Sequence, residues 1–307
     1  KKPRAAICLI GGEGVGMVTK PGLPVDIGEP AVNPVPRRML CRNIAEELLR
    51  MDCRKNMGAC HMRSISWQPP CKPHVVMPLD GLPEELDSLL IEVEVHVPKG
   101  RRLAVRTLNP RLGIVGGISI LGTTGLVKPF SHEAYEETIQ SALSVAASNG
   151  CQHVVLSTGG KSERFAQGYL PDQHPEAFIQ IADFYAFSLS EAKKMGFAGV
   201  VHSVFFGKLV KMALGHPYTH AHKTSLDLNI VARTAEEKGC GRVFRRKLET
   251  ANTARHALEL LLAKKALNVV RSLAERALES SRKITGKEMS VRILLFDYDG
   301  SLLVDIR

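Results

Sequence analysis

The chain has 307 residues, of which 44% are hydrophobic and 23% charged, so it can form two domains with a sizeable core and is not a disordered chain. No apolar run reaches the ~18 residues of a membrane helix, and the apolar stretch near the N-terminus is too short for a signal peptide, so we expect a cytoplasmic protein. The formal net charge of +10 favours an anionic partner, and aromatic residues, at only 5%, are too few to favour nucleic acid.

The first hundred residues predict a smaller α+β domain over residues 1–105. Residues 22–40 are rich in proline and are expected to be mostly extended or looped. A short helix is predicted from Met39 to Met51, and residues 90–98, "LIEVEVHVP", alternate in polarity as a half-buried strand does. Residues 52–83 are rich in Pro, Cys and Met without a clear period, and we interpret them as an insertion.

Residues 106–307 predict an α/β domain with a largely parallel sheet flanked by helices, because helical and short apolar segments alternate. The first helix is expected to begin at Ser131 as N-cap and to end at Asn149 and Gly150. The strands are expected at 153–158, 177–182, 198–205 and 290–296, and the helices that follow at 183–195, 206–215 and within 225–283.

The seven cysteines are odd in number and irregularly spaced, which argues against a disulfide framework. One group of thiols and imidazoles could supply zinc ligands: Cys53, Cys60, His61, Cys71 and His74. No C-x-x-C pair arranges them as a tetrahedral site, so we predict no metal site and keep a structural zinc as the alternative.

Three motifs resemble phosphate or nucleotide sites but each lacks an essential part. The glycines of "GGEGVG" are two apart, whereas a dinucleotide fingerprint needs its third glycine three after the second. Residues 117–124, "GISILGTT", have Thr123 in place of the P-loop lysine. Residues 294–303, "LLFDYDGSLL", resemble the aspartate loop of haloacid-dehalogenase phosphatases, with Asp297 as nucleophile, but the downstream motifs are absent. We therefore expect a terminal strand and turn there.

A glycine-rich stretch, "LGIVGGISILGTTGLVKP" at residues 112–129, is the strongest candidate for a ligand site. Its glycines allow backbone N–H groups to approach a ligand, and Ser119, Thr123 and Thr124 add hydroxyls. If the next helix begins near Ser131, the loop follows the carboxyl end of a strand, where open α/β sheets bind ligands. The alternative is a glycine-rich turn that serves packing alone.

Two long motifs closely resemble the CbiD family, the cobalt-precorrin-5B C-1 methyltransferases of the anaerobic vitamin B12 pathway: "EGVGMVTKPGLPVDIGEPAVNPVPRRM" and "LNPRLGIVGGISILGTTGLVKPFS". "STGGKSERFA", "GKLVKMALG" followed by "YTHAHKT", and "ANTARHALELL" come in the order that this family has. Members usually begin with a threonine-rich "R-x-G-x-T-T-G-T" segment that is not found here, so the N-terminal domain is expected to be truncated.

The resemblance implies methyl transfer from S-adenosyl-L-methionine to C-1 of cobalt-precorrin-5B, which gives cobalt-precorrin-6A. The alternative is a non-catalytic remnant of the family that binds a tetrapyrrole or a partner protein. Neither nucleic acid nor a membrane is expected as a partner, and a homo-oligomer is left open.

The residues expected at the site follow from the matched motifs. The cofactor pocket would be lined by Gly116, Gly117, Ser119, Gly122, Thr123, Thr124, Gly125, Gly159 and Gly160, with Asp183 accepting from ribose hydroxyls or, alternatively, capping a helix. The substrate carboxylates would meet His222 and the basic residues Arg37, Arg38, Arg111, Lys128, Lys161, Arg164, Lys208 and Lys211, each of which could instead be an ordinary surface residue. His220 is the candidate base, against a purely structural role.

Overall fold

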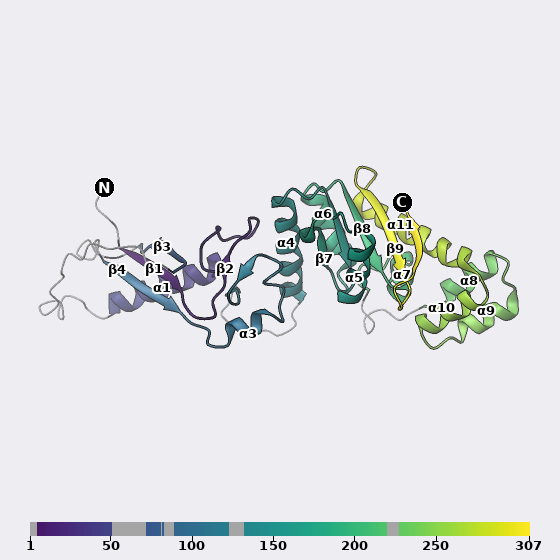
Figure 1. Ribbon diagram of the computed structural model, residues 1–307, viewed down its shortest axis with the longest axis horizontal. Coiled ribbons are helices and arrows are strands. Elements are labelled where there is room, and N and C mark those ends of the chain that lie inside the picture. Colours follow the sequence, from purple (N-terminus) through teal and green to yellow (C-terminus); the bar gives the residue numbers. More distant parts are fainter. Residues whose placement is uncertain (1–4, 51–71, 81, 83–88, 123–131, 220–226) are drawn as a thin grey trace, which may run out of the picture. The chain divides into compact units, whose positions relative to one another are not determined.

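The computed structural model describes residues 5–50, 72–80, 82, 89–122, 132–219 and 227–307. They form two compact units, unit 1 within residues 1–129 and unit 2 within residues 130–307 (Figure 1).

Unit 1 is built around a three-stranded sheet with the order β3-β1-β4. The central strand β1 (Ala6–Gly11) runs antiparallel to β3 (His74–Pro78) and parallel to β4 (Leu90–Val95). The helix α1 (Pro34–Arg50) has no fully buried residue, but its apolar face lies against the buried cluster of Ala5, Ile7 and Leu79 through Cys41, Ile44, Ala45 and Leu48. The predicted strand at 90–98 is confirmed by β4.

Two predictions in unit 1 are corrected by the structure. The helix α1 begins at Pro34, before the predicted Met39, since a proline is tolerated in the first turn, where N–H groups have no partner within the helix. The predicted insertion at 52–83 contains β3, whose five residues pair with β1 and whose Val75 and Met77 pack against the core. Proline and cysteine content concealed this strand.

Unit 1 extends beyond the predicted boundary at 105/106. The short helix α3 (Gly100–Ala104) is followed by β5 (Ile114–Val115), which pairs antiparallel with β2 (Met17–Val18). Ile114 is buried with Val18, so the segment after residue 105 is part of the core of unit 1. The division between the units therefore falls at Pro129 and Phe130.

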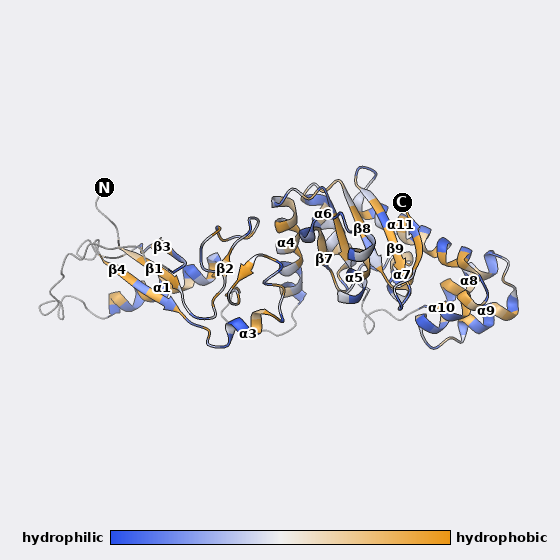
Figure 2. Ribbon diagram, in the orientation of Figure 1, coloured by the Kyte–Doolittle hydropathy of each residue, from blue (hydrophilic) through white to orange (hydrophobic). Residues whose placement is uncertain are grey.

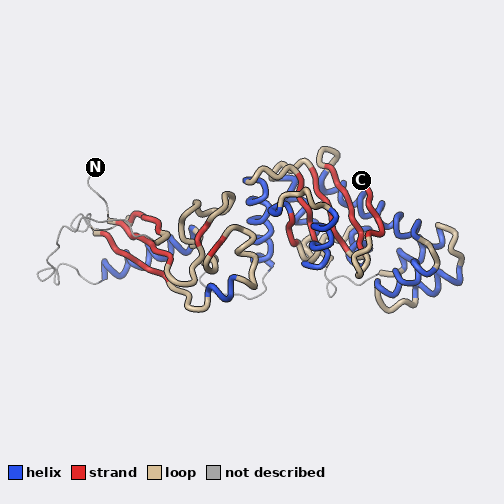
Figure 3. Tube along the Cα trace, in the orientation of Figure 1, coloured by secondary structure: helices blue, strands red, loops and turns tan. Residues whose placement is uncertain are grey.

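Unit 2 contains a five-stranded, mostly parallel sheet with the order β10-β9-β8-β6-β7 (Figure 3). The strands β6 (His153–Ser157), β7 (Phe178–Gln180), β8 (Gly199–Val204) and β9 (Ser290–Phe296) are parallel, and β10 (Leu302–Ile306) is antiparallel to β9. The predicted α/β class and parallel sheet are confirmed.

Helices cover both faces of this sheet because successive strand residues point to opposite sides. On one side, Val155, Val201 and Leu294 pack against α5 (Gly160–Tyr169). The larger core on the other side is closed by α4 (His132–Ser148), α6 (Tyr185–Lys194), α7 (Phe206–Ala213), α8 (Asn229–Glu237), α10 (Ala254–Ala263) and α11 (Leu267–Thr285). Figure 2 shows hydrophobic residues along the strands between these helix layers.

The helical predictions in unit 2 are confirmed in type and differ in detail. α5 and α9 (Arg242–Glu249) are found where no separate helix was expected. A short 3-10 helix at Pro175–Ala177 precedes β7. Within the helical stretch expected at 225–283, α10 and α11 are separate helices, because Lys265 adopts a left-handed φ of 58° that ends the first of them.

Candidate functional site

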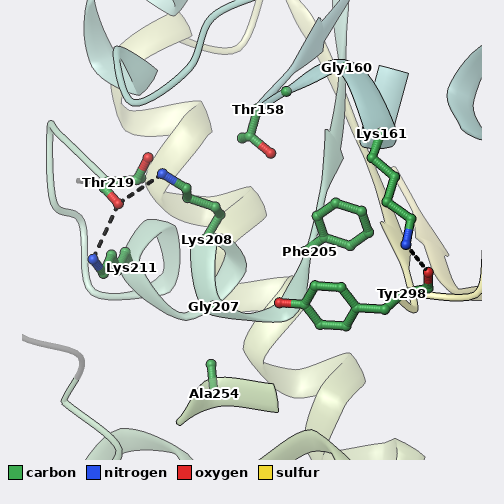
Figure 4. A pocket seen from close by; sticks show the side chains of 11 residues that line it. Thr158, Gly160, Lys161, Phe205, Gly207, Lys208, Lys211, Thr219, Ala254 and Tyr298 are labelled. Carbon is green, nitrogen blue, oxygen red and sulfur yellow. Dashed lines mark hydrogen bonds between the residues drawn. The ribbon is translucent and has the colours of Figure 1, made fainter. Parts of the chain in front are cut away.

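A cavity of about 510 Å³ opens in unit 2 at the carboxyl ends of the parallel strands (Figure 4). Its wall is formed by residues that follow β6, β8 and β9 and by residues of α7 and α10. The carboxyl edge of a parallel sheet is the usual place for a ligand in an open α/β fold. This cavity is therefore the candidate functional site.

The loop from β6 to α5 forms one side of the cavity with Thr158, Gly159, Gly160 and Lys161. Gly159 is the N-cap of α5, and a Cβ atom at this position would have no other atom within 4 Å. The bare backbone at the start of α5 therefore borders open space. The first N–H groups of a helix lack partners within it and carry a partial positive charge, which favours an anionic group at this end.

Lys208 and Lys211 come from one face of α7 and point to the same atom. Their Nζ atoms donate to the carbonyl oxygen of Thr219, at 3.1 Å and 3.2 Å (Figure 4). Burial lowers the pKa of Lys208, and the charge of Lys211 lowers it further, to about 8. Burial also lowers the pKa of Lys211, which is only 5% exposed. The cavity wall thus holds two ammonium groups that are partly shielded from water.

Asp183 lies beside this pair, at the end of the turn after β7. Its carboxylate forms an ion pair with Lys208 and accepts a hydrogen bond from the Thr219 hydroxyl at 3.3 Å. The Thr219 N–H donates to the backbone carbonyl of Asp183 at 3.0 Å. The N-cap of α6 is Phe184, without a side-chain cap, so the expected alternative of Asp183 as a helix cap is wrong.

Aromatic rings form another part of the wall. Tyr298 stacks on Phe205 with ring centroids 4.8 Å apart and planes 5° apart. The guanidinium carbon of Arg255 lies 5.1 Å from the Tyr298 centroid, and Lys161 Nζ donates to the Tyr298 carbonyl at 2.5 Å. In Figure 4 the Tyr298 hydroxyl points towards Gly207 of α7. A Cβ at Gly207 would lie 3.2 Å from the Ala254 Cβ on α10, which is closer than an ordinary van der Waals contact.

Tyr298 belongs to the motif that resembles a phosphatase loop. The expected strand and turn are found, because the Asp297 N–H donates to the Ser301 carbonyl at 2.8 Å in the hairpin between β9 and β10. The same turn carries Tyr298 into the cavity wall. Its position at the carboxyl end of a parallel strand was the signal that could have identified it.

The structure brings five predicted residues of unit 2 together at one cavity, Lys161 among them, although the sequence assigned them to two ligands. Gly159 and Gly160 were expected to bind the cofactor, and Lys161, Lys208 and Lys211 the substrate. Arg164 is exposed on α5 and does not line the described part of this cavity. The wall residues that were not predicted are Thr158, Phe205, Gly207, Thr219, Ala254 and Tyr298.

The glycine-rich loop belongs to unit 1, and its glycines have distinct structural roles. Gly116 and Gly122 adopt positive φ angles of 85° and 124°. Gly117 packs against the backbone of Gly14, where a Cβ would lie 2.2 Å from the Gly14 carbonyl oxygen. Ser119 donates to the Asn109 side-chain oxygen at 3.3 Å. The loop follows the two-residue strand β5 of an antiparallel pair, so the expected position at the edge of a parallel sheet is wrong.

The predicted basic residues of unit 1 differ in their surroundings. Arg37 donates to the Val32 carbonyl at 2.7 Å and pairs with Glu29 at 2.7 Å, so it holds the segment before α1 in place. Arg38 is exposed on α1, and Arg111 is half-buried in the turn before β5. A role of these residues towards substrate stays a prediction.

Several predicted residues lie outside the described part of the chain: Thr123, Thr124, Gly125, Lys128, His220, His222, Cys53, Cys60, His61 and Cys71. Within residues 72–80, His74 is described on β3, where its Nδ1 lies 3.0 Å from the Lys72 carbonyl. The described residues contain no group of three or more His, Cys, Asp or Glu side chains arranged to hold a metal ion. None of the described helices has both the length and the apolar character to cross a bilayer.

Comparison with known proteins points to one family. A family model described as CbiD matches residues 1–58 and 77–129, and one described as the C-terminal domain of CbiD matches residues 218–306. A Priestia megaterium protein named cobalt-precorrin-5B C(1)-methyltransferase is 36% identical over 97% of this chain and 72% of its own length. A protein of the same name from Nitratidesulfovibrio vulgaris is 39% identical over 97% of this chain and 68% of its own. A crystal structure of the cobalamin biosynthesis protein CbiD from Archaeoglobus fulgidus is 23% identical with a TM-score of 0.22, over 66% of this chain and 51% of that one.

Proposed function

We propose, because the chain belongs to the CbiD family, that it transfers a methyl group from S-adenosylmethionine to C-1 of cobalt-precorrin-5B and so gives cobalt-precorrin-6A in anaerobic cobalamin biosynthesis. The names of the relatives from two organisms support this reaction. The structural observation that carries the proposal is the cavity of unit 2, where a bare helix start, two lysines and an aromatic wall meet.

The residues of this cavity fit S-adenosylmethionine in size and in chemistry. A volume of about 510 Å³ falls within the range of about 300–1,000 Å³ that is common for small-molecule pockets. The start of α5 and the lysines of α7 suit a carboxylate, and the hydroxyl of Thr158 can hydrogen-bond to a nucleoside. The rings of Phe205 and Tyr298 offer apolar contact for a base or a sulfonium.

The reaction requires the chain to bind and align the methyl donor and the tetrapyrrole, without forming a covalent bond to either. The bound methyl donor would supply an electrophilic methyl group: the bond from this carbon to sulfur breaks with its electron pair left on sulfur, a π-electron pair of the macrocycle forms the new bond at C-1, and the macrocycle gives up one proton to solvent. The residues around the cavity would hold the donor and the ring carbon in line and exclude water. A wall of backbone, hydroxyl and aromatic groups is suited to this task.

The positive charge of the chain agrees with a substrate that carries many acetate and propionate groups. The formal net charge is +10, and cationic clefts raise the local concentration of anionic ligands. We also propose that the chain acts in the cytoplasm, where its methyl donor is made.

The test is a methyl-transfer assay with S-adenosylmethionine labelled in the methyl group and purified cobalt-precorrin-5B. We expect a labelled product heavier than the substrate by one CH₂ group, with one S-adenosylhomocysteine formed per turnover. Calorimetric titration with S-adenosylhomocysteine, with ATP as control, tests the donor site separately. Saturable binding without turnover would instead indicate a binding protein. The absence of both binding and turnover would refute the proposal.

A further inference from the structure

One exposed turn of unit 1, residues 99–106, concentrates positive charge; we call it the cationic turn. Residues 95–122 contain five Lys or Arg residues and no Asp or Glu. Four of these cations lie on or beside the short helix α3, and all four are exposed: Lys99, Arg101, Arg102 and Arg106. They take part in none of the ion pairs within the described part of the chain. Their charge is therefore available to an anionic ligand.

Aliphatic side chains are exposed among these cations. Val105 is 79% exposed and Leu103 is 46% exposed. Val115 and Leu121 follow along the chain, so residues 103–121 hold four of the eleven exposed large hydrophobic side chains among the described residues. Exposed apolar groups that gather in one segment mark a binding surface, whereas single ones are common on any protein. The cationic turn thus combines charge with apolar contact.

The buried side of α3 determines which side chains face outwards. This side is formed by Gly100 and Ala104. Val105 follows the helix and keeps helical φ and ψ angles of −59° and −25°, so the helical turn continues. Positions three and four apart share a side of a helical turn, which places Val105 between Arg101 and Arg102, away from the buried side.

Hydrogen bonds hold the cationic turn against the glycine-rich segment. The backbone carbonyl of Asn109 accepts from the Ile114 N–H at 2.8 Å, and its side-chain oxygen accepts from the Ser119 hydroxyl at 3.3 Å. The Thr107 hydroxyl donates to the Ala104 carbonyl at 2.8 Å. The backbone that carries the cations is thus fixed before a ligand arrives, which lowers the entropic cost of binding.

We propose that the cationic turn binds the tetrapyrrole substrate by its carboxylate arms and along one apolar edge of the macrocycle. This rests on the proposed function, whose substrate combines a conjugated ring with acetate and propionate groups. Arginine can hold a carboxylate with two parallel hydrogen bonds, and Leu103 and Val105 offer contact to the ring.

Other anionic partners fit the cationic turn less well. Residues 95–122 contain no Phe, Trp or Tyr on which the bases of a nucleic acid could stack. A single exposed turn is also small beside the roughly 800 Å² that each partner buries in a stable protein interface. A small anionic ligand with an apolar body matches both the size and the chemistry of this surface.

The experiment measures affinity by calorimetry for cobalt-precorrin-5B and for S-adenosylhomocysteine. The variants are the double exchange Arg102→Gln/Arg106→Gln and the single exchange Val105→Ser. The matched control is Arg42→Gln/Arg50→Gln, which removes the same charge from exposed positions of α1 in the same unit. Melting temperatures show that each variant is folded.

The expected losses follow from the exposure of the cationic turn. A pair of opposite charges at an exposed site is worth up to about fivefold in affinity. We therefore expect the Arg102→Gln/Arg106→Gln variant to lose about tenfold for cobalt-precorrin-5B, and Val105→Ser to lose about threefold. Neither should change the affinity for S-adenosylhomocysteine. Wild-type affinity for the tetrapyrrole should also fall with added salt, and the double variant should respond less.

Three results would overturn the proposal: a tetrapyrrole loss no larger than that of the control, equal losses for both ligands, or no tetrapyrrole binding by the folded wild type. Turnover is measured separately. Tetrapyrrole binding that depends on the cationic turn, without methyl transfer, would refute the proposed function alone. Methyl transfer with binding that does not depend on the cationic turn would refute this proposal alone.

Discussion

Lys208 on α7 and Asp183 after β7 form an ion pair at the wall of the unit 2 cavity, with side chains 27% and 22% exposed. Asp183 lies in the connection between β7 and α6, Lys208 lies within α7, and both also contact Thr219. This pair links three segments of the chain at the candidate site and determines where the lysine head group lies.

Replacement of Asp183 by Asn should free Lys208 while the backbone hydrogen bond from Thr219 is retained. The pKa of Lys208 should fall further, because its nearest negative charge is gone and burial still opposes the ammonium form. We expect a loss of about 1–2 kcal/mol in the free energy of unfolding. Chemical denaturation and NMR titration of the lysine side chain measure the two effects. Glu279→Gln, which removes an exposed partner of Lys283 on α11, should leave both almost unchanged.

Affinity for a carboxylate ligand should depend on pH through Lys208. Its pKa is lowered to about 8, so the ammonium form dominates below that pH and is lost above it. Among the residues that the structure describes, the charged groups beside it are Asp183 and Lys211. We expect the affinity to fall as the pH rises from 7 to 9, and the Lys208→Met variant to show a flatter profile over that interval. A wild-type affinity that rises with pH would contradict the assignment.

His202 should make unit 2 sensitive to acid. Its ring is fully buried on β8, 5.4 Å from the Tyr185 ring, and neither ring nitrogen has a hydrogen-bond partner among the described residues. Burial lowers its pKa from 6.5 to about 4. The unfolded chain therefore binds the proton more tightly, and stability is lost as the pH falls from about 6.5 towards about 4.

The expected loss from His202 is about 3 kcal/mol over this interval. Urea denaturation of wild type and His202→Leu at pH 7 and pH 4 measures it. The variant should lose less stability on acidification than the wild type by that amount. His256→Gln, at an exposed position on α10, serves as control and should follow the wild type.

Gly100 should not tolerate a methyl group. A Cβ there would lie 2.0 Å from the carbonyl oxygen of Gly14, and backbone at this crossing cannot move aside easily. We expect Gly100→Ala to destabilise unit 1 by about 1–3 kcal/mol. Gly168→Ala, on α5 where a Cβ meets nothing within 4 Å, should be neutral or slightly stabilising. Thermal denaturation followed by circular dichroism compares the two.

Tyr298 should contribute to ligand binding through its ring rather than its hydroxyl. Its ring lines the cavity and stacks on Phe205, and an aromatic contact with a ligand is worth about 0.5–1.5 kcal/mol beyond the buried area. Tyr298→Ala should therefore weaken binding of S-adenosylhomocysteine by about threefold to tenfold, whereas Tyr298→Phe should retain it. Equal losses in both variants would indicate that the hydroxyl is the important group.

Much of the fold of unit 2 could be predicted because its helices and strands have clear hydrophobic periods. Ile139, Leu143 and Ala146 recur at helical spacing and are buried on α4. α5 was missed because Gly160 and Gly168 stand within ten residues and its buried face is short. β3 was missed because prolines and cysteines surround it and because its pairing partner, β1, is more than sixty residues away in the sequence.

The sequence by itself determined the family, the α/β class of unit 2 and the types of residue at the site, because long motifs and hydrophobic periods are local properties of a chain. It named Gly159, Gly160, Lys208 and Lys211 one by one, but it divided them between two ligands. Only the tertiary structure decided that they share one cavity with Tyr298 and that Asp183 pairs with Lys208. The physical reason is that the register of parallel strands brings the ends of distant segments to one edge of the sheet, and no local pattern encodes that register.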